Sequence, residues 1–126
     1  MKGMFQGGQE AAKTIMKDTK QSQGLIADVE TVANENRDTL SEYWEAITLM
    51  FSMMKDYFDK KYDKIPVTSV ALVIVSFLFV VSPFRVLPRW LPFGAFMERT
   101  LVLVLVLEFI KDDLEQYSAW KLQQDA

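Results

Sequence analysis

Cysteine and histidine are both absent from the 126 residues of this chain. Without cysteine there is no disulfide framework, no thiolate nucleophile and no sulfur ligand for a metal ion. Without histidine the usual proton shuttle at neutral pH is missing as well. The sequence also lacks a glycine-rich phosphate loop and the ligand spacings typical of metal sites. These absences exclude zinc and nucleophile–histidine chemistry, and we expect no catalytic residue, no metal and no cofactor.

Paired carboxylates are the remaining route to hydrolysis, and their spacing argues against it. Glu98 and Glu108, placed on one helix, would lie about 15 Å apart by rise alone, too far for the carboxylate pairs of glycoside hydrolysis. We therefore predict that the chain is not an enzyme. The formal net charge is −3, and neither half of the chain has an excess of lysine and arginine. A polybasic nucleic-acid surface is excluded, so we expect no nucleic-acid partner.

Charge is also absent from a long apolar block that runs from Val67 to Phe84. As a helix this block would be about 27 Å long, close to the hydrocarbon thickness of a bilayer. Pro66 suits the first turn of a helix, because the N–H that it lacks would be unpaired there. The block therefore predicts a membrane helix over about 66–82. The first residues lack the apolar run of a secretory signal, so this block is the expected insertion signal.

The four prolines are confined to residues 66–92, and those after the apolar block predict an irregular connection over 83–94. A second apolar block, Thr100 to Ile110, would give about 16 Å of helix. A full crossing would draw Glu98 and Arg99 into the bilayer at about 2.5–3.5 kcal/mol each. We predict a second helix over about 95–120. It is either short and shallow, or it carries functional intramembrane charge at Glu98, Arg99 and Glu108.

Apolar or small residues recur through the first half of the chain in alternating steps of four and three. A straight helix would drift by about 20° per heptad against this pattern, so its constant phase favours a coiled coil. We predict a flexible terminus over 1–8 and a coiled-coil or amphipathic helical region over 9–62. The predicted oligomer or partner interface consists of Ile15, Ile26, Val29, Ala33, Asn36, Leu40, Tyr43, Ile47, Met50, Met54 and Tyr57.

Two interpretations of this region stay open. Gly24 costs a helix about 1 kcal/mol relative to alanine, and the polar run Asn34–Asp38 is followed by residues with capping-box spacing. The region is therefore either one helix over about 9–62 or two helices with a break near 36–39. Most residues from Tyr43 to Phe58 are apolar, more than a single seam can bury. This segment predicts contacts on two faces, with partner helices or with lipid headgroups.

Several short motifs occur together in the second half of the chain. They are Lys64-Ile65-Pro66, the run from Ala71 to Ser82-Pro83, Leu87-Pro88, Leu91-Pro92, Gly94 and Asp113-Leu114-Glu115-Gln116-Tyr117. Together they resemble the DUF1232 family, also called YkvA-like proteins, over about residues 58–120. That family consists of small membrane proteins of undefined activity. The resemblance therefore implies a membrane hairpin over 63–126 and supplies no reaction.

The turn of the predicted hairpin departs from the family pattern in charge. Arg85 and Arg89 stand where the pattern has acidic residues, and Glu98-Arg99 stands where it has an acidic pair. If those carboxylates bind a cation or a proton in the relatives, the resemblance implies that this chain does not. Guanidinium groups suit phosphates or carboxylates instead. We predict lipid or partner-anion contacts at Arg85, Arg89, Trp90 and Arg99, with a plain solvated loop as the alternative.

Basic residues set the expected orientation of the hairpin. Lys55, Lys60, Lys61, Lys64, Lys111 and Lys121 flank it, whereas Arg85, Arg89 and Arg99 lie in its connection. The positive-inside rule then favours both termini in the cytoplasm. We expect the chain in the inner, or cytoplasmic, membrane.

The sequence as a whole predicts an all-α membrane protein: a long N-terminal amphipathic or coiled-coil helix followed by a helical membrane hairpin. The expected function is a non-enzymatic membrane-anchored scaffold or accessory subunit. Its expected partners are membrane lipids and either further copies of itself or a helical partner, bound through the N-terminal helix. One alternative is a small oligomeric pore or membrane-disrupting effector lined by Glu98, Arg99 and Glu108. A third hypothesis is a lipid-remodelling protein with a shallow hairpin.

Overall fold

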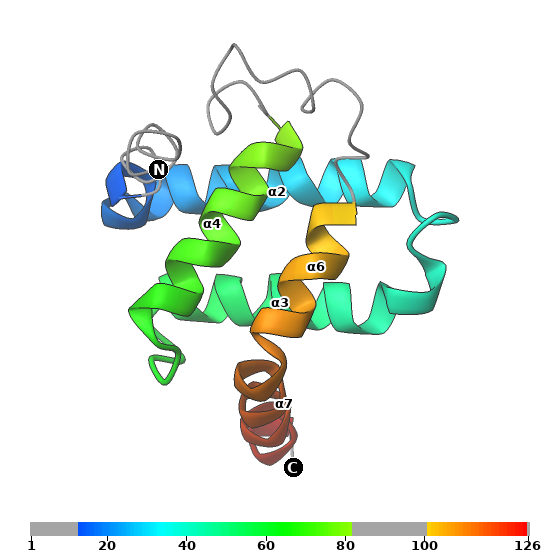
Figure 1. Cartoon of the computed structure of the whole chain (residues 1–126). Helices are drawn as coiled ribbons and strands as arrows, with labels where there is room; N and C mark the ends of the chain where they lie inside the picture. Colours follow the sequence, from blue (N-terminus) through cyan, green and yellow to red (C-terminus); the bar gives the residue numbers. More distant parts are fainter. Residues whose placement is uncertain (1–12, 82–100, 126) are drawn as a thin grey trace.

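A computed structural model of the protein describes residues 13–81 and 101–125, which form helices joined by turns (Figure 1). The elements are α2 (Thr19–Glu35), the 3-10 turn η1 (Ser41–Tyr43), α3 (Trp44–Phe58), α4 (Val67–Val81), α6 (Leu101–Phe109) and α7 (Lys111–Asp125). Residues 13–17 add a short helical segment before α2. No strand occurs within these two ranges, so the all-α prediction is confirmed. The terminus predicted over 1–8 lies outside the described residues.

The helix α2 begins at an N-cap. Asp18 has an extended backbone conformation, and its carboxylate accepts the N–H of Gln21 at 3.2 Å. An aspartate at this position satisfies an N–H that the first helical turn leaves unpaired. The buried hydroxyl of Ser22 donates to the carbonyl of Ile15 at 2.6 Å. The short segment before Asp18 is therefore fastened to the first turn of α2.

The first half of the chain contains separate helices rather than one. After α2 ends at Glu35, a turn runs through residues 36–40 to η1. The side-chain amide of Asn36 donates to the carbonyl of Val32 at 2.8 Å, a carbonyl that the helix end would otherwise leave free. The interpretation as one continuous helix over 9–62 is therefore wrong. The break lies where the other interpretation puts it.

The helices α2 and α3 pack side by side in opposite directions (Figure 1). Two polar contacts join them: Lys55 pairs with Glu30 at 2.8 Å, and Gln23 donates to Asp59 at 2.5 Å. Exposed ion pairs contribute about 1 kcal/mol or less. Burial of the facing apolar side chains therefore supplies most of the stability of this pair.

The C-terminus of α3 is closed by a Schellman motif. The N–H of Lys61 donates to the carbonyl of Asp56 at 2.9 Å, and the N–H of Lys60 donates to that of Tyr57 at 3.1 Å. Lys60 has φ 63°, a left-handed conformation. This position usually holds glycine, which adopts such a φ without a steric penalty. The chain can then turn sharply toward α4.

The helices α4 and α6 lie side by side in opposite directions and cross the α2–α3 pair as a second layer (Figure 1). The apolar core lies between the layers and receives buried side chains from every helix. Phe77 of α4 meets Phe51 of α3 there, with ring centroids 5.6 Å apart. The carbonyl of Pro66 accepts the N–H of Val70 at 3.1 Å, so Pro66 stands directly before the first turn of α4.

The predicted helix over 66–82 therefore matches α4, which runs from Val67 to Val81.

The helices α6 and α7 meet at Ile110, where the chain changes direction without proline or glycine (Figure 1). The predicted helix over 95–120 is two helices in its described part, and residues 95–100 lie outside that part. Both Ile110 and Leu114 are buried. Since α6 packs on α3 and α4 whereas α7 packs on α3, the bend lets both segments bury their apolar side chains.

Within residues 13–81 and 101–125, no helix combines the length and the apolar content that a bilayer crossing requires.

Candidate functional site

An apolar surface lies on the side of α4 and α6 that faces away from α2 and α3. Apart from Val67, the first residue of α4, the large exposed apolar side chains of these two helices are Leu72 (38% exposed), Leu101 (48%), Leu105 (56%) and Phe109 (75%), and we call these four the outer face. The three members on α6 are spaced four residues apart, so they share one side of that helix. No charged residue occurs within 67–81 or 101–107. Exposed apolar surface of this kind marks a contact site for a protein, a ligand or a membrane.

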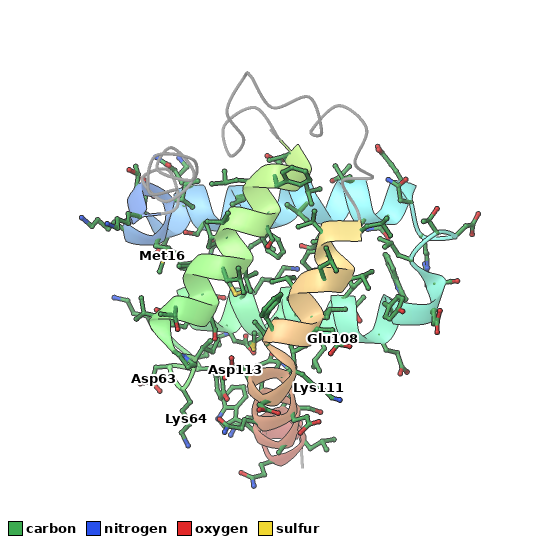
Figure 2. All side chains as sticks on the ribbon, viewed as in Figure 1. Met16, Asp63, Lys64, Glu108, Lys111 and Asp113 are labelled. Atoms are coloured by element: carbon green, nitrogen blue, oxygen red, sulfur yellow. The ribbon has the colours of Figure 1, made fainter. Side chains whose placement is uncertain are left out.

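Charged side chains border this surface at one end of the α4–α6 layer. Asp63 and Lys64 precede α4, and Glu108 and Lys111 lie where α6 passes into α7. Figure 2 shows these four residues, with Asp113, gathered at the same end of the molecule. The layer therefore combines an uncharged outer face with a charged border at the end where the chain enters α4 and leaves α6.

A polar cluster centred on the buried Asp56 and Tyr117 joins α3 to α7. The hydroxyl of Tyr117 donates to Asp56 Oδ2 at 2.5 Å, and the hydroxyl of Ser52 lies 2.6 Å from the same phenol oxygen. Lys121 Nζ lies 3.4 Å from Asp56 Oδ2. We call these four residues the α3–α7 cluster. A buried carboxylate is costly unless it is paired and hydrogen-bonded. Tyr117 supplies the hydrogen bond to Asp56, and Lys121 supplies the opposite charge.

The protonation of this cluster follows from its burial. Burial raises the pKa of the Tyr117 phenol above its ordinary value of 10.0, and the hydrogen bond to Asp56 raises it further. Interaction with the phenol charge of Tyr117 raises the pKa of Lys121, an effect that the charge of Asp56 reinforces. Across the neutral range the phenol therefore stays a hydrogen-bond donor and Lys121 stays a cation.

Aromatic rings and a second polar link surround the cluster. The Tyr62 ring centroid lies 5.1 Å from that of Tyr117 and 5.0 Å from that of Trp120. The hydroxyl of Ser69, on α4, donates to Asp113 of α7 at 2.7 Å. Because Tyr117 is fully buried, a substrate cannot reach its phenol, and these contacts fix the position of α7. In the described part of the chain no group of acidic side chains is arranged to hold a metal ion.

A groove of about 350 Å³ runs between α3, α6 and α7. Apolar side chains form most of its walls: Tyr43, Ala46, Leu49, Val104, Leu107 and Leu114. Three charged residues, Glu108, Lys111 and Glu115, also line it and are exposed. This volume falls at the lower end of the range for small-molecule pockets.

The residues of the predicted oligomer or partner interface lie mainly inside the chain's own core. All are buried against other helices of the same chain, except Asn36 and Tyr57, which are half-buried, and Tyr43, which is 41% exposed. Their heptad spacing therefore has an intramolecular cause, because α2 packs against α3 and α4, and α3 packs against α2, α6 and α7. An interface with another chain through these residues stays a prediction.

Most of the predicted charged sites fall outside the described residues. These are Arg85, Arg89, Glu98 and Arg99, and Trp90 lies outside them too, so lipid or anion contact at the arginines and Trp90 stays a prediction. Glu108 is described, and it is exposed at the end of α6. It lines the groove with Lys111. A pore lined by these charges likewise stays a prediction.

Sequence reasoning did not identify the α3–α7 cluster. The available signal was Asp56, a single acidic residue near the end of the apolar segment 43–58. Tyr117 and Lys121 are four residues apart, so they share one side of a helix and can both reach one carboxylate. Their pairing with Asp56 across 61 and 65 residues of chain leaves no local pattern.

Comparison with known proteins identifies a relative. The chain is 31% identical over 77 residues to the uncharacterized membrane protein YkvA of Bacillus subtilis strain 168, and the matched region covers 61% of this chain and 73% of that protein. The chain belongs to the YkvA family. No family profile and no solved structure matches this YkvA-family chain significantly. Its fold and candidate sites therefore rest on its own residues.

Proposed function

We propose that this chain is a non-enzymatic, membrane-anchored scaffold or accessory subunit, and that its YkvA-like family is the DUF1232 family. The observation that carries the proposal is the outer face, an exposed apolar surface on a layer whose helices contain no charge before Glu108. The name of its relative, a membrane protein, agrees with a lipid environment. Lipid contact would remove the outer face from water.

The energy available from this surface can be bounded. Full burial of a leucine or phenylalanine side chain is worth about 1.5–3 kcal/mol, and the four outer-face side chains are between 38% and 75% exposed. Together they would supply roughly 4–5 kcal/mol. Such an anchor is reversible by itself. The proposal therefore includes further lipid contacts from the connection 82–100, at Arg85, Arg89, Trp90 and Arg99.

The direction of the helices supports an orientation. Because α4 and α6 run in opposite directions (Figure 1), the chain enters and leaves the layer at the charged border. Contact through the outer face would then leave the rest of the chain on one side of the bilayer, the cytoplasmic side in this proposal. The α2–α3 pair would be free to bind a helical partner or a second copy. Tyr43 is the exposed member of the predicted interface.

Flotation with phosphatidylcholine vesicles tests the anchor. We expect the full chain to float with the vesicles and the variant L101Q/L105Q to bind about 20–30-fold more weakly, since two half-exposed leucines account for roughly 2 kcal/mol. Leu122 on α7 is 70% exposed and lies outside this layer. The L122Q variant is therefore the matched control and should float like the unmodified chain.

Two results would count against the proposal. Either the full chain remains in the aqueous fraction at every lipid concentration, or L101Q/L105Q and L122Q weaken binding equally. In the second case apolar exposure alone, and not the outer face, would explain vesicle binding.

A further inference from the structure

The groove between α3, α6 and α7 is lined by both apolar and charged side chains. Val104 and Leu107 of α6 face Ala46 and Leu49 of α3 across it. A unit the size of a water molecule occupies about 30 Å³. Since a methylene group is of similar size, the whole groove of about 350 Å³, its charged part included, holds at most roughly a dozen chain carbons. The apolar part therefore suits a single hydrocarbon chain.

The charged part of the groove alternates in sign. Glu108 lies on α6, Lys111 and Glu115 lie on α7, and all three line the groove. Figure 2 labels Glu108 and Lys111 near the bend between the two helices. All three are exposed. Among the described residues none of them forms an ion pair. The groove thus presents one ammonium group flanked by two carboxylates.

We propose that this groove binds one acyl chain of a zwitterionic phospholipid that carries a primary ammonium group. The chain would lie along the apolar walls, the lipid phosphate against Lys111, and the lipid ammonium between Glu108 and Glu115. Charge-assisted hydrogen bonds of this kind are about twice as strong as neutral ones. This inference rests on the proposed function, because a bilayer in contact with the outer face would supply the lipid.

The charge of the groove argues for this headgroup over an anionic one. The two carboxylates and one ammonium that line the groove carry a net charge of about −1, which repels a fatty acid or an anionic phospholipid. A phosphate with an attached ammonium matches both signs. The apolar walls likewise exclude free inorganic phosphate as the main ligand, because it would leave them exposed to water.

The probe is lauroyl-lysophosphatidylethanolamine, kept below its micelle concentration, with lauroyl-lysophosphatidylglycerol as the anionic comparison. Calorimetric titration of the full chain should give at least tenfold tighter binding of the ethanolamine lipid. The A46F variant places a ring in the groove and should weaken that binding at least tenfold. Circular dichroism checks that A46F keeps its helices.

A second variant tests the headgroup contacts without altering the apolar walls. In E108K/E115K all three charged residues of the groove are lysines, so the preference should invert toward the glycerol lipid. The matched control is E35K, an exposed glutamate on α2 outside the groove, which should keep the original preference. A purely structural role of Glu108 and Glu115 would not invert a headgroup preference.

Several outcomes overturn the inference. Equal binding of the two lipids would do so, as would A46F binding that matches the unmodified chain, or an unchanged preference in E108K/E115K. A loss of self-association in A46F, measured by sedimentation with no change in lipid binding, would instead identify the groove as a protein contact. Vesicle flotation tests the proposed anchor independently of lipid binding in the groove. If flotation persists while the groove shows no lipid preference, this inference fails and the proposed anchor stands.

Discussion

Replacement of Tyr117 by phenylalanine removes the central hydroxyl of the α3–α7 cluster and almost nothing else. That hydroxyl donates to Asp56 at 2.5 Å and lies 2.6 Å from the hydroxyl of Ser52. The ring would keep its contacts with Tyr62 and Trp120. Y117F therefore isolates the polar contribution of the cluster from its packing.

The expected loss of stability can be worked from these contacts. A hydrogen bond to a charged group is worth about 1.5–3 kcal/mol, and a buried polar group left without its partner adds a desolvation penalty. In Y117F the carboxylate of Asp56 would retain Lys121, at 3.4 Å. This long contact offsets part of the loss. We expect the free energy of unfolding to fall by about 2–3 kcal/mol.

Urea unfolding followed by circular dichroism at 222 nm measures this change. Y43F is the matched control, because Tyr43 is exposed and its hydroxyl should contribute less than about 0.5 kcal/mol. A double-mutant cycle of Y117F with D56A then isolates the contact itself. The coupling energy should be about 1–2 kcal/mol, with a single cooperative transition in every variant.

The reasoning is refuted if Y117F unfolds at the same urea concentration as Y43F. It is refuted equally if Y117F is destabilised but the cycle with D56A gives no coupling. The second result would assign the loss to packing of the ring rather than to the Tyr117–Asp56 hydrogen bond.

Three further predictions concern stability. G24A should raise the free energy of unfolding by about 0.5–1 kcal/mol in urea titrations, because Gly24 is exposed inside α2 and an added Cβ meets nothing within 4 Å. K60G should stabilise by a similar roughly 0.5–1 kcal/mol in thermal melts, because Lys60 holds φ 63° at the end of α3; an unchanged or lowered melting temperature would contradict this. Stability should fall as pH rises above about 10, because the folded chain raises the pKa of Tyr62, Tyr117 and Lys121 and the unfolded chain releases those protons first. In urea titrations between pH 9 and 11.5 the decline should be shallower for Y117F, and an equal decline would exclude Tyr117 as a source.

Local chemistry made part of this fold predictable. The span of α4 follows from a run without charge that begins after Pro66, and the turn after α2 follows from a polar run that cannot be buried. The break at Ile110 has no comparable local signal, because no proline, glycine or capping residue marks it in the sequence. It depends on α6 packing against both α3 and α4 while α7 packs against α3, which is a property of the assembled fold.

The candidate sites show the same contrast between features with a local sequence pattern and features that depend on the assembled fold. A periodic stripe such as Val29, Ile47 and Met50 shows that these side chains are buried, but periodicity alone does not reveal which helix covers them. In this fold α2 and α3 pack against each other as well as against α4 and α6. The groove likewise depends on the bend at Ile110, which brings α6 and α7 against α3. Residues that meet only after the chain has bent share no spacing that a sequence can show.

The α3–α7 cluster can be completed only late in synthesis. Asp56 and Tyr117 are separated by 61 residues, so at roughly 5–20 residues per second the ribosome adds the phenol about 3–12 s after the carboxylate. Throughout that interval the carboxylate has neither Tyr117 nor Lys121 available and stays hydrated, which opposes closure of the end of α3 around it. The end of α3 can therefore close around Asp56 only after α7 has left the ribosome exit tunnel.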